Sequence, residues 1–322
     1  MVNTVTGQIS VQELGKTLMH EHIQFGYPGY QGDVTFGGWK KEEALATIKA
    51  SMDIVHSHGV NTIVDATPNE CGRDAAFLKE VSETFGINIV CSTGFYYEGE
   101  GGSAYFHFRS ALTDITKEIE DMMHTEITKG IADTGVRAGV IKLASSKDVI
   151  TDYERAFFTA GAKVAIATGV PIITHTQEGT MGPDQAELLL GLGVPANQIM
   201  IGHMDGNTNI EYHKKTLDQG VRIAFDRCGI QFIVGMPSDA ERVAIFSELV
   251  KAGYTDRLHL SHDMVINMLG RSIVPTPELA PVFERLYIGN IFDNIIPELK
   301  DAGVTQQQID QILNDNPQQL FT

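Results

Sequence analysis

The strongest constraint on the fold is a repeated alternation of short apolar segments with longer helical patterns along the whole chain. Each short segment has the length and composition of a buried strand and is followed by polar and glycine-rich residues. Eight such segments occur, at residues 17–23, 61–67, 88–94, 138–144, 170–176, 198–204, 221–227 and 257–263. Short buried strands that alternate with helices predict parallel strands joined by helical crossovers.

The helical segments carry apolar residues at three- and four-residue spacing, and several end in glycine just before the next strand. The clearest are residues 41–59, 73–86, 118–135 and 153–169. Eight such units favour a closed barrel over an open sheet, and no G-x-G-x-x-G follows the first strand. We therefore predict an α/β fold, a single (β/α)8 TIM barrel over residues 1–322. After a long loop (264–286), helical segments near 291–301 and 305–314 should cover one flank.

The composition restricts the partners and the compartment. The formal net charge of −17 at pH 7 should repel nucleic acid and anionic membranes, and it suits a protein that concentrates cations. No run approaches the roughly 18 apolar residues that a membrane span needs, and the N-terminus lacks a secretory pattern. Three scattered cysteines, Cys71, Cys91 and Cys228, do not form a disulfide framework. We expect a cytoplasmic protein that acts on small molecules.

Residues able to bind metal ions recur at the C-terminal ends of the predicted strands. In a β/α barrel these ends meet at one mouth, where the βα loops build the active site. The first strand contains two histidines two residues apart, so both should point into the barrel. A lone histidine there would more often be structural, but the joint pattern predicts a metal centre. The candidates are His20, His22, Lys142, His175, His203 and Asp263.

Other histidines fit structural roles. His56 and His58 also form an H-x-H, but they end a helical segment, where histidine stabilises the helix C-terminus. His262 precedes Asp263 and should point to the opposite face of the strand, where we expect a packing role.

Lys142 lies within the apolar run GVIKLA, where a buried ammonium is costly unless it is paired or neutral. A neutral amine beside cations can react with carbon dioxide to give a carbamate, whose two oxygens can bridge two metal ions. A salt bridge to a buried carboxylate such as Asp65 or Asp226 would explain the lysine taken alone. Beside the histidines, we predict the carbamate.

These motifs resemble the phosphotriesterase-like branch of the amidohydrolase superfamily. HEH, VIKLA, THT, IGH and SHD carry the resemblance, which runs from VTG near the N-terminus to NPQQLF near the C-terminus. Segments such as 25–35, 92–102 and 173–183 resemble the phosphotriesterase-like lactonases, above all those that act on γ- and δ-lactones. Organophosphate hydrolases of the family have Trp-Phe after the Thr-Gly of the third strand, whereas Tyr96 and Tyr97 follow Phe95 here.

The resemblance implies two divalent metal ions. Zinc is expected, and cobalt, iron and manganese also suit imidazole and carboxylate ligands. Lys142, as a carbamate, and a hydroxide would bridge the pair. The implied ligands are His20, His22 and Asp263 for the more buried metal, and His175 and His203 for the more exposed one.

The resemblance also implies roles around the metals. Tyr96 should face the exposed metal and the substrate, and Arg227 occupies a position where the lactonases have arginine and the triesterases histidine. Asp263 would take the proton of the attacking hydroxide and pass it to the leaving alkoxide. Asp205, next to His203 in the sixth loop, is either a polar partner of that ligand or exposed. The expected pocket residues are Tyr27, Glu70, Tyr97 and Met268; relatives have Asp at position 70, and several have Trp at position 268.

The predicted function is hydrolysis of γ- and δ-lactones, or of N-acyl-homoserine lactones, by a metal-bridging hydroxide in a homodimer. Weak promiscuous phosphotriesterase activity is expected, because neutral phosphotriesters can use the same nucleophile. The alternative is a dedicated organophosphate phosphotriesterase. A non-catalytic metal-binding barrel belongs to a different class, and an NAD-linked barrel reductase lacks its expected Tyr/Lys/Asp/His arrangement.

Overall fold

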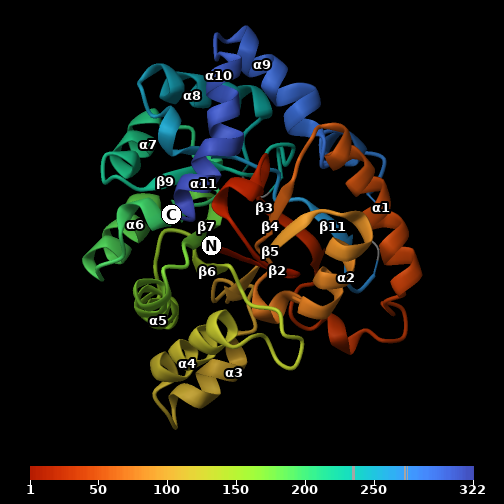
Figure 1. Ribbon diagram of the computed structural model, residues 1–322, viewed down its shortest axis with the longest axis vertical. Coiled ribbons are helices and arrows are strands. Elements are labelled where there is room, and N and C mark those ends of the chain that lie inside the picture. Colours follow the sequence, from red (N-terminus) through yellow and green to blue (C-terminus); the bar gives the residue numbers. More distant parts are fainter. Residues whose placement is uncertain (234–235, 272, 274) are drawn as a thin grey trace.

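The computed structural model describes residues 1–233, 236–271, 273 and 275–322, and it confirms the predicted β/α barrel (Figure 1). In this part of the chain eight parallel strands follow one another around the wall, each hydrogen-bonded to the next from β3 to β10. Each overlaps one of the eight predicted segments. They are β3 (Thr17–Phe25), β4 (Thr62–Asp65), β5 (Asn88–Gly94), β6 (Val140–Ser145), β7 (Ile172–Thr176), β8 (Ile199–Ile201), β9 (Arg222–Phe225) and β10 (Leu258–Leu260).

The last strand joins the first through β11 (Val265–Met268), which continues beyond β10 and pairs in parallel with β3. Val265 lies opposite His22, and the N–H of Asp263 donates to the carbonyl of His20 at 3.1 Å. The prediction of a loop from residue 264 to 286 is therefore wrong at its start. Four residues are too few to show a strand periodicity in the sequence.

Helices surround the strands, with caps that explain their ends. Thr151 forms a capping box with Glu154 at the start of α5, and Gly169 ends that helix in a left-handed conformation. The predicted helix 118–135 is α4, which ends earlier, at Thr128, because Gly130 turns the chain with a φ of 131°. The helices are α1 (Lys41–Ser57), α2 (Ala75–Phe85), α3 (Ser103–Ser110), α4 (Ile115–Thr128), α5 (Asp152–Thr168), α6 (Gly182–Gly191), α7 (Ile210–Leu217) and α8 (Asp239–Lys251).

Two helical segments near the C-terminus confirm the prediction for that region. The first consists of a π-helical turn (Ile291–Ile295) and α9 (Ile296–Asp301), and α9 packs on α8. The second consists of α10 (Gln306–Asp310), a π-helical turn (Gln311–Asp315) and α11 (Asn316–Leu320). In Figure 1, α9 and α10 lie beside α8 on one flank of the barrel.

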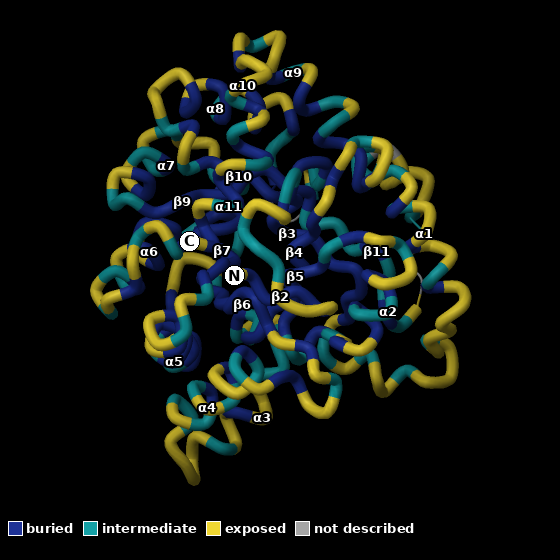
Figure 2. Tube along the Cα trace, viewed as in Figure 1, coloured by how far each residue is buried: buried dark blue, intermediate teal, exposed yellow. Residues whose placement is uncertain are grey.

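Two apolar layers form the core, and the buried strands run through its centre (Figure 2). The larger layer lies between strands and helices. The smaller one takes one side chain from each of seven strands and fills the barrel interior: Met19, Val64, Val90, Val140, Ile173, Met200 and Ala224. Leu320 and Phe321 pack on it together with Val2, which lies on the first strand of an antiparallel hairpin, β1 (Val2–Thr4) and β2 (Gly7–Ile9). This hairpin was not predicted. Both termini therefore close the end of the barrel opposite the mouth (Figure 1).

No helix in the described ranges is both long and apolar enough to span a membrane.

Candidate metal centre

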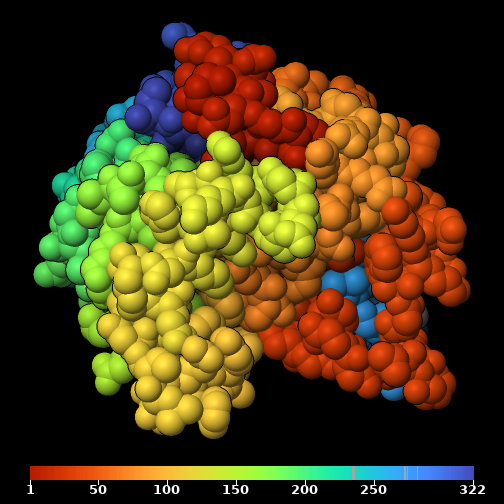
Figure 3. Space-filling view, turned by 60° about the horizontal axis from the view of Figure 1, so that its bottom comes forward, coloured from red at the N-terminus to blue at the C-terminus, as the bar shows by residue number. Residues whose placement is uncertain are grey.

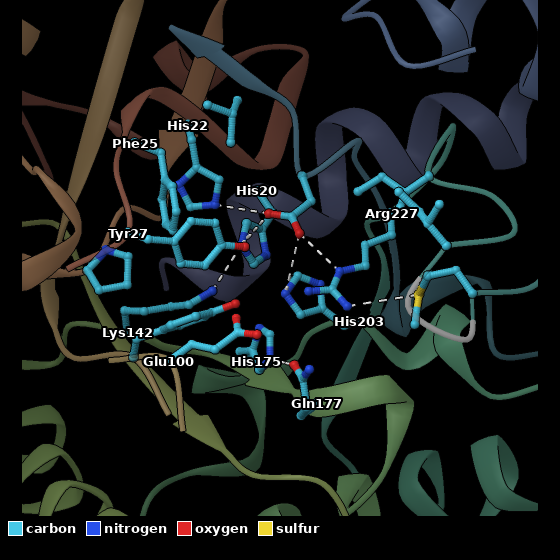
Figure 4. Close-up of a pocket in the computed structure, with 17 residues that line it drawn as sticks. His20, His22, Phe25, Tyr27, Glu100, Lys142, His175, Gln177, His203 and Arg227 are labelled. Atoms are coloured by element: carbon cyan, nitrogen blue, oxygen red, sulfur yellow. Dashed lines mark hydrogen bonds and ion pairs between the residues drawn. The ribbon is translucent and has the colours of Figure 1, made fainter. Parts of the chain in front are cut away.

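The six candidate metal-binding side chains meet at the C-terminal mouth of the barrel and line one cavity of about 210 Å³ (Figure 4). His203 and Asp263, which follow their strands within three residues, have φ values of 57° and 54°. This left-handed conformation turns the backbone out of each strand where the side chain enters the cavity. The six come from β3 (His20, His22), β6 (Lys142), β7 (His175) and the segments after β8 (His203) and β10 (Asp263).

Asp226 orients two of the histidines. Its Oδ2 lies 2.7 Å from Nδ1 of His20, and its Oδ1 lies 2.8 Å from Nδ1 of His203. Because a carboxylate accepts, each Nδ1 carries the proton and each Nε2 keeps its lone pair. The sequence points to Asp226 only as a possible partner of Lys142, although its position at the end of the seventh predicted strand is a signal for this second role.

The Nε2 atoms of three histidines face Asp263. Oδ1 of Asp263 lies 2.9 Å from Nε2 of His22 and 3.5 Å from Nε2 of His20, and Oδ2 lies 3.7 Å from Nε2 of His203. His20, His22 and Asp263 offer ligand atoms that all lie within 4.8 Å of one another. Imidazole nitrogens with a carboxylate oxygen are donors that suit zinc and related divalent ions. The side chains present therefore fit a divalent metal ion.

His175 completes the group from the opposite wall. Its ring centroid lies 4.5 Å from that of His203 in an edge-to-face contact. Its Nε2 lies 2.8 Å from Oε1 of Gln177, which leaves Nδ1 as the nitrogen available to a ligand.

Burial and neighbouring charges set protonation states that suit metal binding. Burial lowers the pKa of His175 well below its usual value and the pKa of His203 to about 3, so both rings are neutral at pH 7. Burial opposes ionisation of Asp263, but the hydrogen bond from His22 and the positive charge of Arg227 hold its pKa well below the usual range. Neutral imidazoles and an ionised carboxylate are the forms that bind cations.

Lys142 is buried, and its Nζ lies 2.9 Å from Nε2 of His20. Burial lowers the pKa of Lys142 to about 8. No carboxylate in the described part of the chain forms an ion pair with it: Asp226 is engaged by the two histidines, and Asp65 accepts backbone N–H groups. The salt bridge considered as an alternative is therefore not formed. Gly94 at the end of β5 permits close approach here, because a Cβ at that position would overlap the carbonyl of Lys142.

Arg227 follows β9, lines the cavity and donates its Nε–H to Oδ2 of Asp263 at 3.0 Å. Asp205 lies behind it: Oδ2 of Asp205 accepts the backbone N–H of Arg227 at 3.1 Å and lies 2.8 Å from Nε of the buried Arg242. Asp205 is neither exposed nor hydrogen-bonded to His203, so neither expectation for it holds. It supports the backbone of Arg227 instead.

Aromatic side chains form one wall of the cavity. Tyr27 and Tyr96 line it together with Phe25, whose ring centroid lies 5.1 Å from that of Tyr27 and 6.3 Å from that of Tyr96. Tyr97 stacks on His175 with a centroid separation of 5.3 Å. Glu70 lies behind this wall, where its Oε1 accepts the N–H of Tyr96 at 2.7 Å.

Of the four expected pocket residues, Tyr27 lines the cavity, whereas Glu70, Tyr97 and Met268 do not. Met268 lies farthest from the expectation. It lines a separate groove beside Trp39, whereas Val265, from the same strand, lines the cavity. Several further cavity residues come from the third, fifth and seventh loops, where no periodic pattern in the sequence marks them. They are Glu100, Gln177, Ile230, Ile233 and Met236.

Comparison with known proteins agrees with this geometry. Residues 1–321 match the model of the phosphotriesterase family. The structure of the organophosphorus hydrolase from Deinococcus radiodurans is 53% identical, covers 100% of this chain and 96% of its own, and superposes with a TM-score of 0.98. A structure from the molecular engineering of organophosphate hydrolysis activity from a weak promiscuous lactonase template is 51% identical, with full coverage of both chains and a TM-score of 0.98.

A more distant relative is the phospho-furanose lactonase of Mycoplasmopsis agalactiae, which is 30% identical over 99% of this chain and 91% of its own. The match to the family extends over the whole barrel, including every strand end that carries a candidate ligand. The resemblance expected from the sequence motifs is thus confirmed. The chain belongs to the phosphotriesterase family and is a metal-dependent hydrolase.

Proposed function

We propose that this protein hydrolyses lactones, with γ- and δ-lactones as its main substrates, N-acyl-homoserine lactones as a further class and weak activity on phosphotriesters. The observation that carries the proposal is the convergence of four histidines, Lys142 and Asp263 on one largely apolar cavity. The relatives support the substrate class, since they include a lactonase and a structure from a weak promiscuous lactonase template.

We propose that the buried site, His20, His22 and Asp263, and the more exposed site, His175 and His203, hold two divalent ions, zinc by preference. Such a pair supplies an activated water at neutral pH and polarises the substrate carbonyl.

Lys142 is proposed to join the two sites as a carbamate. Its neutral amine adds to the carbon of carbon dioxide, a new N–C bond forms, and one proton leaves the nitrogen. The carbamate carries one negative charge on two oxygens. Burial of Lys142 and the lack of an ion pair among its described neighbours favour the neutral amine that this step requires.

The chain's own groups would handle protons and orientation. Asp263 accepts the proton of the attacking water and returns it to the leaving alkoxide, which stays attached as the hydroxyl of the opened hydroxy acid. Arg227 holds Asp263 in place through its Nε–H. Tyr96 faces the substrate from the aromatic wall, and Phe25 and Met236 give the cavity apolar surface for the alkyl part of a lactone.

The charges in the cavity favour a neutral substrate. Arg227 is already paired with Asp263, and Glu100 adds an acidic group to the lining. The one arginine in this lining is paired, so no free guanidinium is available to bind the phosphate of a phosphorylated lactone. The substrate class named for the Mycoplasmopsis relative, a phospho-furanose lactone, is therefore not the one proposed here.

Two measurements test the proposal. Purified protein should contain about two divalent ions per chain, and Lys142→Ala should lose metal and at least two orders of magnitude in kcat/KM on γ-nonalactone. Rates on γ-nonalactone and paraoxon, measured side by side, separate a lactonase from the alternative, a dedicated phosphotriesterase. A Lys142→Ala chain with full metal content and full rate contradicts the bridging role.

We also propose a homodimer in a reducing, cytoplasmic environment. Val34, Phe36 and Ile273 expose apolar side chains near the mouth, and Arg271 of the eighth loop contacts Phe36 and Asp33 of the first. In Figure 3 the first loop forms a red-orange lobe against light-blue residues of the eighth loop. The three cysteines are buried and free. Light scattering of the purified protein measures the oligomeric state, and a monomer at micromolar concentration contradicts the dimer.

A further inference from the structure

Glu21 lies between two candidate ligands, yet its side chain does not line the cavity. It is fully buried, and both carboxylate oxygens accept hydrogen bonds from residues 261–264. Oε1 accepts from Ser261 Oγ at 2.8 Å, from the N–H of His262 at 3.0 Å and from Nδ1 of His262 at 2.8 Å. Oε2 accepts from the N–H of Met264 at 2.8 Å. One carboxylate thus binds the backbone on both sides of Asp263.

These hydrogen bonds fill a break in the sheet. β10 ends at Leu260 and β11 begins at Val265, so the intervening residues leave the regular ladder. Asp263 adopts a φ of 54° in this break, a conformation that costs a non-glycine residue about 1 kcal/mol or more. Its own N–H donates to the carbonyl of His20. Glu21 therefore stabilises this strained turn through hydrogen bonds to the residues on either side of Asp263.

His262 extends the connection to the C-terminal helices. Its Nδ1–H donates to Glu21, and its Nε2 accepts the N–H of Ile291 at 3.1 Å, at the start of the helical segment 291–301. His262 thus has the structural role expected for it, and both of its ring nitrogens form hydrogen bonds, one to Glu21 and one to the backbone of Ile291.

We propose that Glu21 is a positioning residue that sets Asp263 for metal binding. Without the four donors to its carboxylate, the turn at Asp263 would relax and its Oδ1 would leave the Nε2 atoms of His20 and His22. Groups that orient metal ligands in this way typically contribute 10- to 100-fold to metal affinity. The inference rests on the proposed function only in requiring a cation at His20, His22 and Asp263.

The test is Glu21→Gln, with cobalt(II) as the probe ion. Glutamine keeps the size of the side chain, but its amide must replace one accepting oxygen. If Oε1 keeps its three donors, the new N–H group faces the N–H of Met264 at a separation of 2.8 Å. We expect one of the two cobalt ions to bind 10- to 100-fold more weakly, and the other to bind as in the parent protein. Competition with a chelator, starting from the metal-free full-length chain, measures both affinities.

Glu126→Gln is the matched control. Glu126 accepts from Arg73 Nη1 at 2.6 Å, Arg73 Nη2 at 2.7 Å and Thr93 Oγ1 at 2.5 Å, and it contacts none of the candidate ligands. The Glu126→Gln substitution should lower the unfolding temperature of the metal-free chain and leave both cobalt affinities unchanged. A loss of cobalt affinity in Glu21→Gln alone therefore separates positioning from general destabilisation.

The proposal is overturned if Glu21→Gln binds both ions as tightly as the parent, or if both variants weaken both ions alike. Should metal-free Glu21→Gln fail to fold by circular dichroism, Ser261→Ala takes its place. This variant removes one donor to Glu21 and also the acceptor of the His20 N–H at 2.9 Å, so at least a several-fold loss at one site is expected, and an unchanged affinity at both sites overturns the proposal. A parent protein that binds two cations but hydrolyses no lactone refutes the proposed function and leaves the role of Glu21 intact.

Discussion

Arg227 donates its Nε–H to Oδ2 of Asp263 across 3.0 Å, while Oδ1 of the same carboxylate faces two histidines. The guanidinium of Arg227 thus fixes one oxygen of Asp263, the residue proposed to carry the proton from the attacking water to the leaving alkoxide. Hydrogen bonds to charged groups contribute about 1.5–3 kcal/mol, or roughly 10- to 100-fold in a rate. We expect Arg227→Ala to lower kcat on γ-nonalactone by that factor, with both metal ions retained. Arg109→Ala, on the exposed helix α3, is the control and should leave kcat unchanged. Equal kcat values for parent and Arg227→Ala contradict this role.

Asp226 supports both candidate metal sites at once, because its two oxygens bind Nδ1 of His20 and Nδ1 of His203. In Asp226→Asn the amide N–H replaces one acceptor, so one imidazole must move its proton to Nε2, where it blocks a ligand. We expect chelator competition to show weaker cobalt binding, by 10- to 100-fold, at a site that involves His20 or His203. Tight binding of both ions in Asp226→Asn would show that the histidine orientation does not depend on this carboxylate.

The strand ends could be predicted from the sequence because two simple rules combine there. Side chains alternate along a strand, and all parallel strands of a barrel end at one mouth. His20, His175 and Asp263 could thus be placed together although 243 positions separate the first from the last (263 − 20). The apolar interior followed from the same alternation.

The supporting carboxylates could not be predicted in the same way. Glu21 and its donors are about 240 residues apart, and nothing in HEH shows where a buried carboxylate finds hydrogen-bond donors. The break between β10 and β11 depends on those bonds, so β11 was missed as well. Glu100 lies in a glycine-rich loop without a period, where the conformation is set by tertiary contacts.

Glu70 should make the stability of the protein depend on pH. Burial raises the pKa of this carboxyl to about 7, from an ordinary value of 4.5, and its Oε2 is buried without a partner among the described residues. In the folded state Glu70 keeps its proton to a higher pH than in the unfolded state. The protein therefore loses stability as pH rises from about 4.5 to 7, by on the order of 3 kcal/mol at most, and no further above that range.

Glu70→Gln removes this titration while it keeps an oxygen for the N–H of Tyr96. The difference in unfolding temperature, variant minus parent, should become more positive by several degrees between pH 5 and pH 8, because only the parent loses stability over this range. Glu83→Gln, at an exposed position of α2, should show no such trend. A constant difference between Glu70→Gln and the parent across this range would place the folded-state pKa of Glu70 near its ordinary value.

Glu100 should select against anionic substrates. It lines the cavity with an exposed side chain, and the arginine of the same lining is paired with Asp263. Two like charges about 4 Å apart in water repel by about 1 kcal/mol, which corresponds to a factor of about five. We therefore expect Glu100→Gln to lower KM for a carboxylated γ-lactone about fivefold and to leave KM for neutral γ-nonalactone unchanged. Because salt screens exposed charges, the difference should shrink between 0.01 and 1 M sodium chloride. A change of equal size for both substrates, independent of salt, would mean that Glu100 acts through its size and not through its charge.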